Sequence, residues 1–153
     1  MSVWYEVIKD LRSYLRSLPT PPARHIEGGA LDAETLDLTA DTNGLTGAIF
    51  LIRDKEPDES IHKGGEGVVM LFAENWVRSD DPDPITGYEA LSKQEDAFKA
   101  ALTTWCEQRP TAIRDVYDII DVEIDETIGD ADSRRPFLGS RTIIKVTWSK
   151  RTI

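Results

Sequence analysis

The sequence is poor in the residues from which disulfides, metal centres and membrane spans are built. Cys106 is the single cysteine among 153 residues, so no disulfide can form within the chain. The two histidines, His25 and His62, fall in separate segments expected to be loops, whereas a closed zinc site normally takes four ligands. No apolar run approaches the roughly 20 residues that cross a bilayer. We therefore expect neither a disulfide scaffold, nor a zinc centre, nor a membrane-spanning protein.

Patterns typical of catalytic sites are also missing. The glycine-containing stretches GLTG and KGGEG lack the Lys-Ser/Thr ending of a phosphate-binding loop. The acidic clusters at 54–59 and 80–83 and the pair Asp130 and Asp132 lack the spacing of a calcium loop. We therefore expect a protein that is not an enzyme and carries no cofactor or metal. A metal-dependent enzyme that uses the acidic loops stays open as an alternative, because a sequence does not show which carboxylates a pocket gathers.

Positive charge is scarce outside the C-terminal part of the chain. The sequence holds 18 Lys and Arg against 28 Asp and Glu, which gives a net charge of −10. Residues 134–153 contain six of the basic residues and none of the acidic ones. The acidic majority argues against general affinity for a nucleic-acid backbone. The uneven distribution predicts a dipolar surface, which can steer an acidic partner or another copy of the same chain.

Hydrophobic periodicity predicts two helices and two β-hairpins in alternation. Residues 3–18 and 86–108 repeat apolar side chains at helical spacing, and a proline follows each segment. Apolar runs at 46–54 and 67–78 have the length of strands and indicate the first hairpin. The order gives an α+β fold, a mostly antiparallel sheet of two hairpins with helices packed on one side. The length fits a single domain, 1–153.

Alternation of apolar and polar residues predicts the second hairpin, from 116–128 and 141–151. Its acidic side chains should face solvent and pair with Lys145 across the strands, while the apolar ones face the core. In the loop-like stretch after the first helix, Leu36 and Leu38 indicate one more short strand. The residues expected on the core side are Ile120, Val122, Ile124 and Ile128, and the acidic ones are Asp121, Glu123 and Asp125.

The segment ADSRRPFLGSR, residues 131–141, is longer than a hairpin turn needs. It places an arginine pair beside two large apolar residues, the composition of an interface anchor with a polar rim. We therefore predict a subunit or partner contact through Arg134, Arg135, Phe137, Leu138 and Arg141. The alternative is a structured loop whose phenylalanine folds back on the sheet. Replacing Phe137 and Leu138 by Asp separates the two, since the docking hypothesis expects an intact fold and the alternative expects unfolding.

The order of these elements resembles the phage tail terminator proteins, the small tail-completion proteins of long-tailed phages and prophages. The shared features are a first amphipathic helix, a hairpin with a long charged loop, and Gly87, Tyr88 and Glu89 leading into a central helix. The closing basic hairpin, RPFLGSRTIIKVTWSKR, carries most of the resemblance. It covers about 45–153, and it leaves the acidic stretch 54–66 and the loop 19–44 unexplained.

The resemblance implies a structural protein of the virion tail, assembled in the bacterial cytoplasm. Such proteins form a homo-oligomeric ring, commonly a hexamer, on the head-proximal end of the tail tube. They stop tube polymerisation and present a surface to the head connector protein, so the implied partners are further copies, the tube protein and the connector. DNA passes through the lumen without specific binding, and no chemistry is needed. A head–tail neck or connector-completion protein is the close alternative, since it can share this layout.

Overall fold

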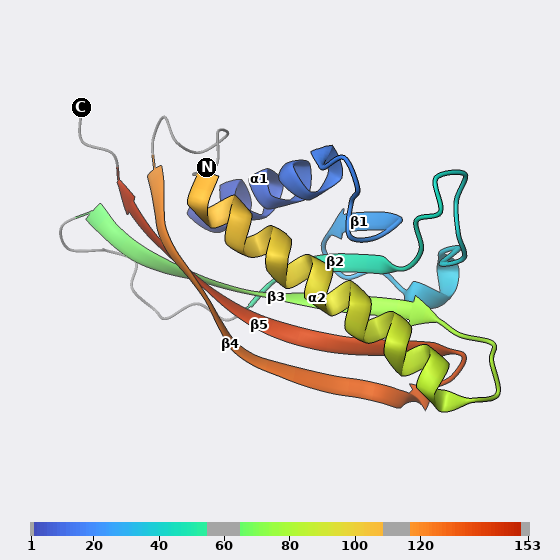
Figure 1. Cartoon of the computed structure of the whole chain (residues 1–153). Helices are drawn as coiled ribbons and strands as arrows, with labels where there is room; N and C mark the ends of the chain where they lie inside the picture. The colour runs from blue at the N-terminus through green and yellow to red at the C-terminus, as the bar shows by residue number, and fades with distance from the viewer. Residues whose placement is uncertain (1, 55–64, 109–116, 151–153) are drawn as a thin grey trace.

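The computed structural model of the chain describes residues 2–54, 65–108 and 117–150. Within them, five strands form one sheet in the order β1-β2-β3-β5-β4, and the helices α1 and α2 lie against one of its faces (Figure 1). The predicted α+β fold, with two antiparallel hairpins and helices on one side, is confirmed. The bounds are α1 Val3–Ser17, β1 His25–Gly28, β2 Ala48–Arg53, β3 Glu66–Arg78, α2 Pro84–Gln108, β4 Tyr117–Arg134 and β5 Phe137–Lys150.

The first strand, β1, makes the sheet mixed rather than purely antiparallel. It pairs in parallel with β2, with His25 opposite Ala48 and Gly28 opposite Leu51. Four residues are too few to show a period of two, so alternation cannot reveal this strand from the sequence. Its place at the end of the sheet brings it beside α1.

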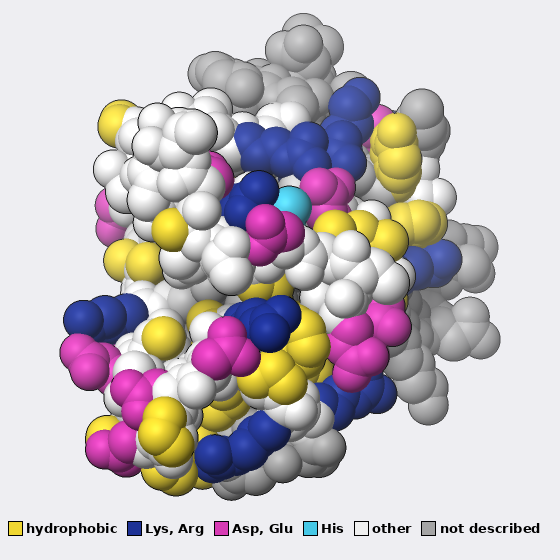
Figure 2. All heavy atoms as spheres, turned by 90° about the vertical axis from the view of Figure 1, so that its right-hand side faces the viewer, with side chains coloured by type: hydrophobic (Ala, Val, Ile, Leu, Met, Phe, Trp, Pro, Cys, Tyr) yellow, Lys and Arg dark blue, Asp and Glu magenta, His cyan; other side chains and the backbone are white. Residues whose placement is uncertain are grey.

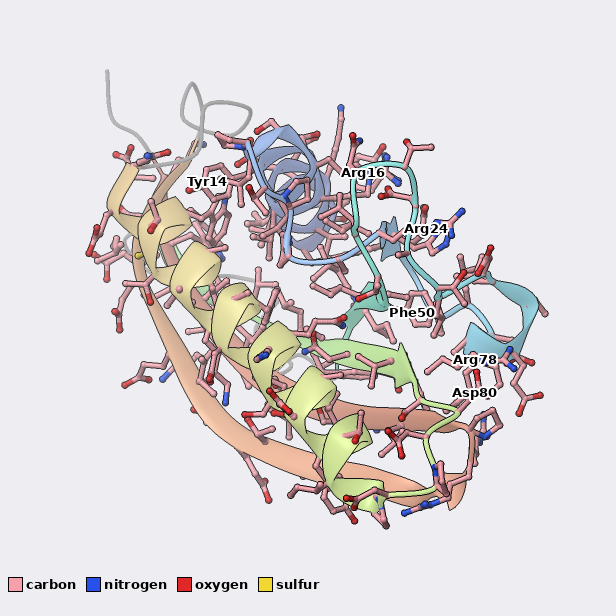
Figure 3. All side chains as sticks on the ribbon, turned by 45° about the vertical axis from the view of Figure 1, so that its right-hand side comes forward. Tyr14, Arg16, Arg24, Phe50, Arg78 and Asp80 are labelled. Atoms are coloured by element: carbon pink, nitrogen blue, oxygen red, sulfur yellow. The ribbon has the colours of Figure 1, made fainter. Side chains whose placement is uncertain are left out.

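The segment after β1 contains a 3-10 turn, Ala33–Thr35, and not the strand expected around Leu36 and Leu38. That expectation is wrong because Asp32 caps the turn, where its side chain accepts a hydrogen bond from the backbone N–H two residues on. Leu38 is buried against Phe50 of β2, which Figure 3 labels. The segment therefore covers part of the sheet face that the helices leave open.

The main core lies between the two helices and the face of the sheet that they cover. The helix α1 contributes Val7, Leu11 and Leu15, spaced by four residues, so that one stripe of the helix is buried. The helix α2 contributes Phe98 and Trp105 in the same way. The strands complete this core with Ile49, Leu51, Val69, Leu71, Ala73, Ile119, Ile144, Val146 and Trp148.

Polar contacts fix α2 on the sheet. The buried side-chain amide of Gln94 donates to the carbonyl oxygen of Ala48 at 2.9 Å and to Oδ1 of Asn75 at 3.1 Å. The next residue, Glu95, is partly buried, and that burial raises the pKa of its carboxyl group. The two hydrogen bonds of Gln94 set the position of the helix along the sheet, because a buried amide without partners is costly.

Trp76 of β3 packs over a glycine of β5. The two residues are cross-strand neighbours, and a methyl group on Gly139 would lie 2.6 Å from two carbons of the indole ring. The ring is rigid and buried, so it has little room to move away. A glycine at this position therefore lets the large side chain lie close to the neighbouring backbone.

We expect Gly139→Ala to lower the free energy of unfolding by about 1–3 kcal/mol, the usual cost of overpacking a core. Urea denaturation followed by circular dichroism measures the change. Gly129→Ala on β4 is the matched control, because its added methyl group would meet nothing within 4 Å. The control should stay within about 0.5 kcal/mol of the unchanged protein. Equal unfolding midpoints for the two variants would contradict this account of Gly139.

The β4–β5 hairpin has a short turn, because both strands continue almost to its tip. The strand β4 ends at Arg134 and β5 begins at Phe137, which leaves Arg135 and Pro136 as the turn. The expectation of a long loop at this place is wrong. A register shift between Asp130 and Arg134 takes up extra residues within β4, so the segment is part of the ladder and not a free loop.

Two bulges in β4 change which side chains face the core. The register shifts after Ile119 and again after Ile124, and each extra residue inverts the alternation. Ile119 is buried in place of Ile120, which is 50% exposed. Val122 packs against the core, and Ile124, opposite the buried Ile144 with no shift between them, lies on the same face but is 40% exposed. Ile128 follows the second shift, lies opposite Arg141 and is exposed. The prediction of one continuous apolar face on β4 is therefore wrong.

Candidate assembly surfaces

The strand β4 forms an exposed edge of the sheet. It is 18 residues long and pairs with β5 alone among the described strands. A long edge strand offers its outer backbone groups as a template for another chain. Its exposed side chains mix apolar and acidic types. We call them the acidic edge, defined as Ile120, Asp121, Glu123, Ile124, Asp125, Glu126 and Ile128.

The acidic edge keeps most of its negative charge. Of the pairs predicted with Lys145, Glu123 forms one, with 3.9 Å between its carboxylate oxygen and Nζ. An exposed pair of this kind contributes at most about 1 kcal/mol. Within the described residues, no ion pair neutralises Asp121, Asp125 or Glu126. Charge on an edge also repels unsuitable chains, so this strand suits a partner that is basic and partly apolar.

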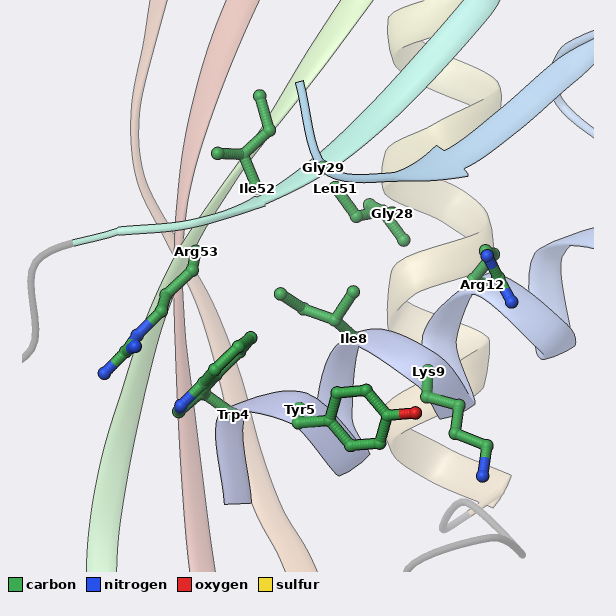
Figure 4. A pocket seen from close by; sticks show the side chains of 10 residues that line it. All are labelled: Trp4, Tyr5, Ile8, Lys9, Arg12, Gly28, Gly29, Leu51, Ile52 and Arg53. Carbon is green, nitrogen blue, oxygen red and sulfur yellow. The ribbon is translucent and has the colours of Figure 1, made fainter. Parts of the chain in front are cut away.

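A second surface lies across the sheet, where a pocket of about 450 Å³ opens between α1 and the strands β1 and β2 (Figure 4). Its floor is apolar and its rim carries the cationic groups of Lys9, Arg12 and Arg53. None of the ten described residues that line it is acidic. We call it the basic pocket, defined as Trp4, Tyr5, Ile8, Lys9, Arg12, Gly28, Gly29, Leu51, Ile52 and Arg53.

Aromatic side chains hold cations at the rim of the basic pocket. The guanidinium of Arg53 lies 4.3 Å from the ring centroid of Trp4, and Nζ of Lys9 lies 5.9 Å from that of Tyr5. The two rings meet edge to face, with centroids 6.2 Å apart. Within the described residues, Lys9 and Arg12 have no carboxylate partner. The pocket therefore presents positive charge over an apolar floor.

Sequence reasoning does not find the basic pocket. Its residues come from 4–12, 28–29 and 51–53, and only the pairing of β1 with β2 under α1 brings them together. The one signal in the sequence is weak. Trp4 stands near Lys9 and Arg12, which lie off the apolar stripe of the first helix and fit an ordinary solvated face.

The arginines predicted from the sequence as contact residues lie in two places. Arg134 and Arg135 are exposed at the tip of the β4–β5 hairpin. Arg141 lies further along β5, on the face away from the helices, where its guanidinium is 3.1 Å from a carboxylate oxygen of Glu74. It also lies 4.3 Å from the ring centroid of Phe72. The structure therefore gives Arg141 partners within its own chain.

The apolar pair of the same segment packs within the fold. Leu138 is 3% exposed and forms a small buried cluster with Val77 and Leu91. Phe137 is half-buried, and the guanidinium of Arg78 lies 5.6 Å from its ring centroid. Leu138 thus anchors the start of β5 to β3 and α2, and Phe137 lies beside Arg78 of β3. A contact with a partner through this segment stays a prediction, and Arg134, Arg135 and Arg141 are its exposed members.

Charges at the end of the molecule seen in Figure 2 occur mostly side by side in opposite signs. Arg24 lies 3.2 Å from Asp37, and Arg78 lies 3.2 Å from Asp80; Figure 3 labels both arginines. Hydrogen bonds from the hydroxyl and backbone N–H of Thr39, together with the Arg24 charge, lower the pKa of Asp37. This end of the molecule has no excess of one sign, unlike the acidic edge and the basic pocket.

Groups that suggested metal or acid–base chemistry do not converge in the described residues. Nε2 of His25 lies 2.7 Å from the backbone oxygen of Asp37, whereas His62 lies outside the described part. No group of three or more His, Cys, Asp or Glu in the described ranges is placed to hold a metal ion. The cluster 80–83 caps α2, where Asp83 accepts the N–H of Ile85 at 3.1 Å. The side chains of the Asp130/Asp132 pair, and residues 55–59, lie outside the described part.

The two described α-helices are too short or too polar to cross a bilayer. No family model matches the chain, and no curated protein matches it. Among solved structures, it is similar to the sheath/tube terminator of an extracellular contractile injection system, PVC, in its extended state. The TM-score is 0.35 at 11% sequence identity, and the match covers 100% of this chain. It covers 58% of that chain, so this protein spans less than two thirds of its length.

Proposed function

We propose that this chain is a structural subunit of a phage or prophage tail, which caps the head-proximal end of the tail tube and forms the surface for head joining. The acidic edge is the observation that carries this proposal. Among the described strands, β4 pairs on one side only, and a strand of 18 residues that also exposes three isoleucines is a hazard in a monomer. In a self-assembling subunit the same strand is covered by the next copy. We therefore propose a homo-oligomeric ring, a hexamer as in the terminator proteins that the sequence resembles.

The arrangement of the elements agrees with a role in assembly. The layout of two helices and two hairpins is that of the tail terminator proteins that the sequence resembles. The proposed partners are further copies, the tube protein and the head connector. DNA would pass through the ring without specific binding, and the protein would not be an enzyme.

Assembly state and tail length test the proposed function together. Light scattering after size-exclusion chromatography should give a mass several times 17.2 kDa at micromolar concentration. Negative-stain electron microscopy of the same fractions should show rings. A phage or prophage lacking the gene should make tails of irregular, excessive length. A monomer at every concentration, or normal tails in the deletion strain, would refute the proposal.

The head–tail neck protein remains the second candidate, since the same layout and a ring would serve it. The two differ in the particle with which the protein travels. A tail-capping protein should sediment with tails from a strain that makes no heads, and a neck protein with heads from a strain that makes no tails. Immunoblots of the two fractions distinguish these outcomes.

A further inference from the structure

Two surfaces of this chain have complementary charge and complementary apolar character. The acidic edge carries carboxylates at Asp121, Asp125 and Glu126 between exposed isoleucines. The basic pocket carries Lys9 and Arg12 above an apolar floor. In each surface the named charges lack an opposite partner within the described residues. The negative charge and exposed isoleucines of the acidic edge thus complement the positive charge and apolar floor of the basic pocket.

The two surfaces cannot meet within one molecule. The sheet order β1-β2-β3-β5-β4 puts the basic pocket beside β1 and β2 and the acidic edge on β4. Three strand spacings, about 14 Å, separate β2 from β4. A contact between the surfaces must therefore join two copies. Because the two patches differ, the contact is head-to-tail, and repetition of such a contact closes a ring when the rotation allows it.

We infer that the acidic edge of one copy docks on the basic pocket of the next. The inference rests on the proposed ring and names the surfaces that build it. An isoleucine of β4 enters the apolar floor beside Ile8, while neighbouring carboxylates meet Lys9 and Arg12. The aromatic rings of Trp4 and Tyr5 flank the contact and exclude water from it, as aromatic residues do at the centre of interfaces.

Charge reversal on each surface tests this pairing. The first variant carries Lys9→Glu and Arg12→Glu, and the second carries Asp121→Lys and Glu126→Lys. Each places like charges across the contact and should raise the concentration needed for assembly by about 100-fold or more. The chain that carries all four changes regains opposite charges and should assemble again. Circular dichroism checks that every variant is folded.

Mixing the two variants gives a sharper result. In an equal mixture, a contact between subunits of different variants joins opposite charges. A contact between two subunits of the same variant joins like charges. Alternation closes only in rings with an even number of subunits. A hexamer should therefore reform from the mixture, and a ring with an odd number should not, although the chain with all four changes assembles in both cases.

The controls separate this inference from the proposed function. Lys93→Glu with Lys99→Glu on α2 changes the net charge as much as the first variant does, at residues that belong to neither defined surface, and should assemble normally. If the two single-surface variants assemble like the unchanged chain, the docking surfaces are wrong and the ring proposal stands. If they fail and the four-change chain also fails, the pairing of these two surfaces is wrong. A monomeric unchanged chain overturns the ring and the pairing together.

Discussion

Leu138→Asp is expected to lower the melting temperature by more than about 10 °C or to prevent folding altogether. Leu138 is 3% exposed, between Val77 and Leu91, and its methyl groups pack against the backbone of Gly87. A carboxylate there would be buried without a partner, which costs several kcal/mol. That is a large share of the roughly 5–15 kcal/mol that holds a domain folded. Thermal unfolding followed by circular dichroism measures the effect.

A matched control for this variant is Ile85→Asp, near the start of α2. Ile85 is 63% exposed, and a negative charge in the first turn of a helix is favourable. The change should stay within about 0.5 kcal/mol. A Leu138→Asp protein with the melting temperature of the unchanged chain would show that Leu138 is dispensable for the fold and restore it as a docking residue. Unfolding, the expected result, supports the alternative in which the Pro-Phe-Leu segment packs on the sheet.

The elements of the fold that were predictable are those whose signal is local. Apolar spacing defines α1 over 3–18 and α2 over 86–108, close to the observed bounds, because each helix buries one stripe. The first hairpin follows from two apolar runs of strand length. The strand β1 gives no such signal, since its four residues, HIEG, owe their pairing to β2.

The bulges of β4 explain why its faces were not predictable. Alternation in the sequence assumes one residue per step, and the extra residues after Ile119 and Ile124 break that rule twice. The sequence correctly indicates acidic residues opposite Lys145, but only Glu123 comes within 4.0 Å of its amino group. Ile120, Ile124 and Ile128 of this strand are exposed, and the assembly surface is inferred from them.

The exposure of the candidate contact residues was also only partly predictable from the sequence. The composition of the hairpin tip indicates an interface anchor, and Arg134 and Arg135 are indeed exposed. The burial of Leu138, by contrast, depends on a space beside Gly87, which belongs to a helix about 50 residues earlier in the chain. A contact of that kind has no signature in the segment itself. The basic pocket is hidden for the same reason, because three distant segments build it.

The bond between Trp105 and Asp10 joins the two helices of the core. Nε1 of Trp105, 1% exposed, donates to a carboxylate oxygen of Asp10, 4% exposed, at 2.9 Å. A buried carboxylate needs donors, since an unsatisfied one is costly. Because α1 also carries the basic pocket, this bond helps to set the place of the pocket over the sheet.

Trp105→Phe is therefore expected to lower the free energy of unfolding by about 3 kcal/mol, which combines lost ring volume with the lost donor to Asp10. Urea denaturation followed by circular dichroism gives the value. Asp10→Leu removes the other partner, and the double variant should lose about 1–2 kcal/mol less than the two single losses combined, since it leaves neither group without its partner. Asp10→Asn keeps an acceptor oxygen for Nε1 and should cost less than Asp10→Leu. Strictly additive losses would mean that the hydrogen bond does not couple the two helices.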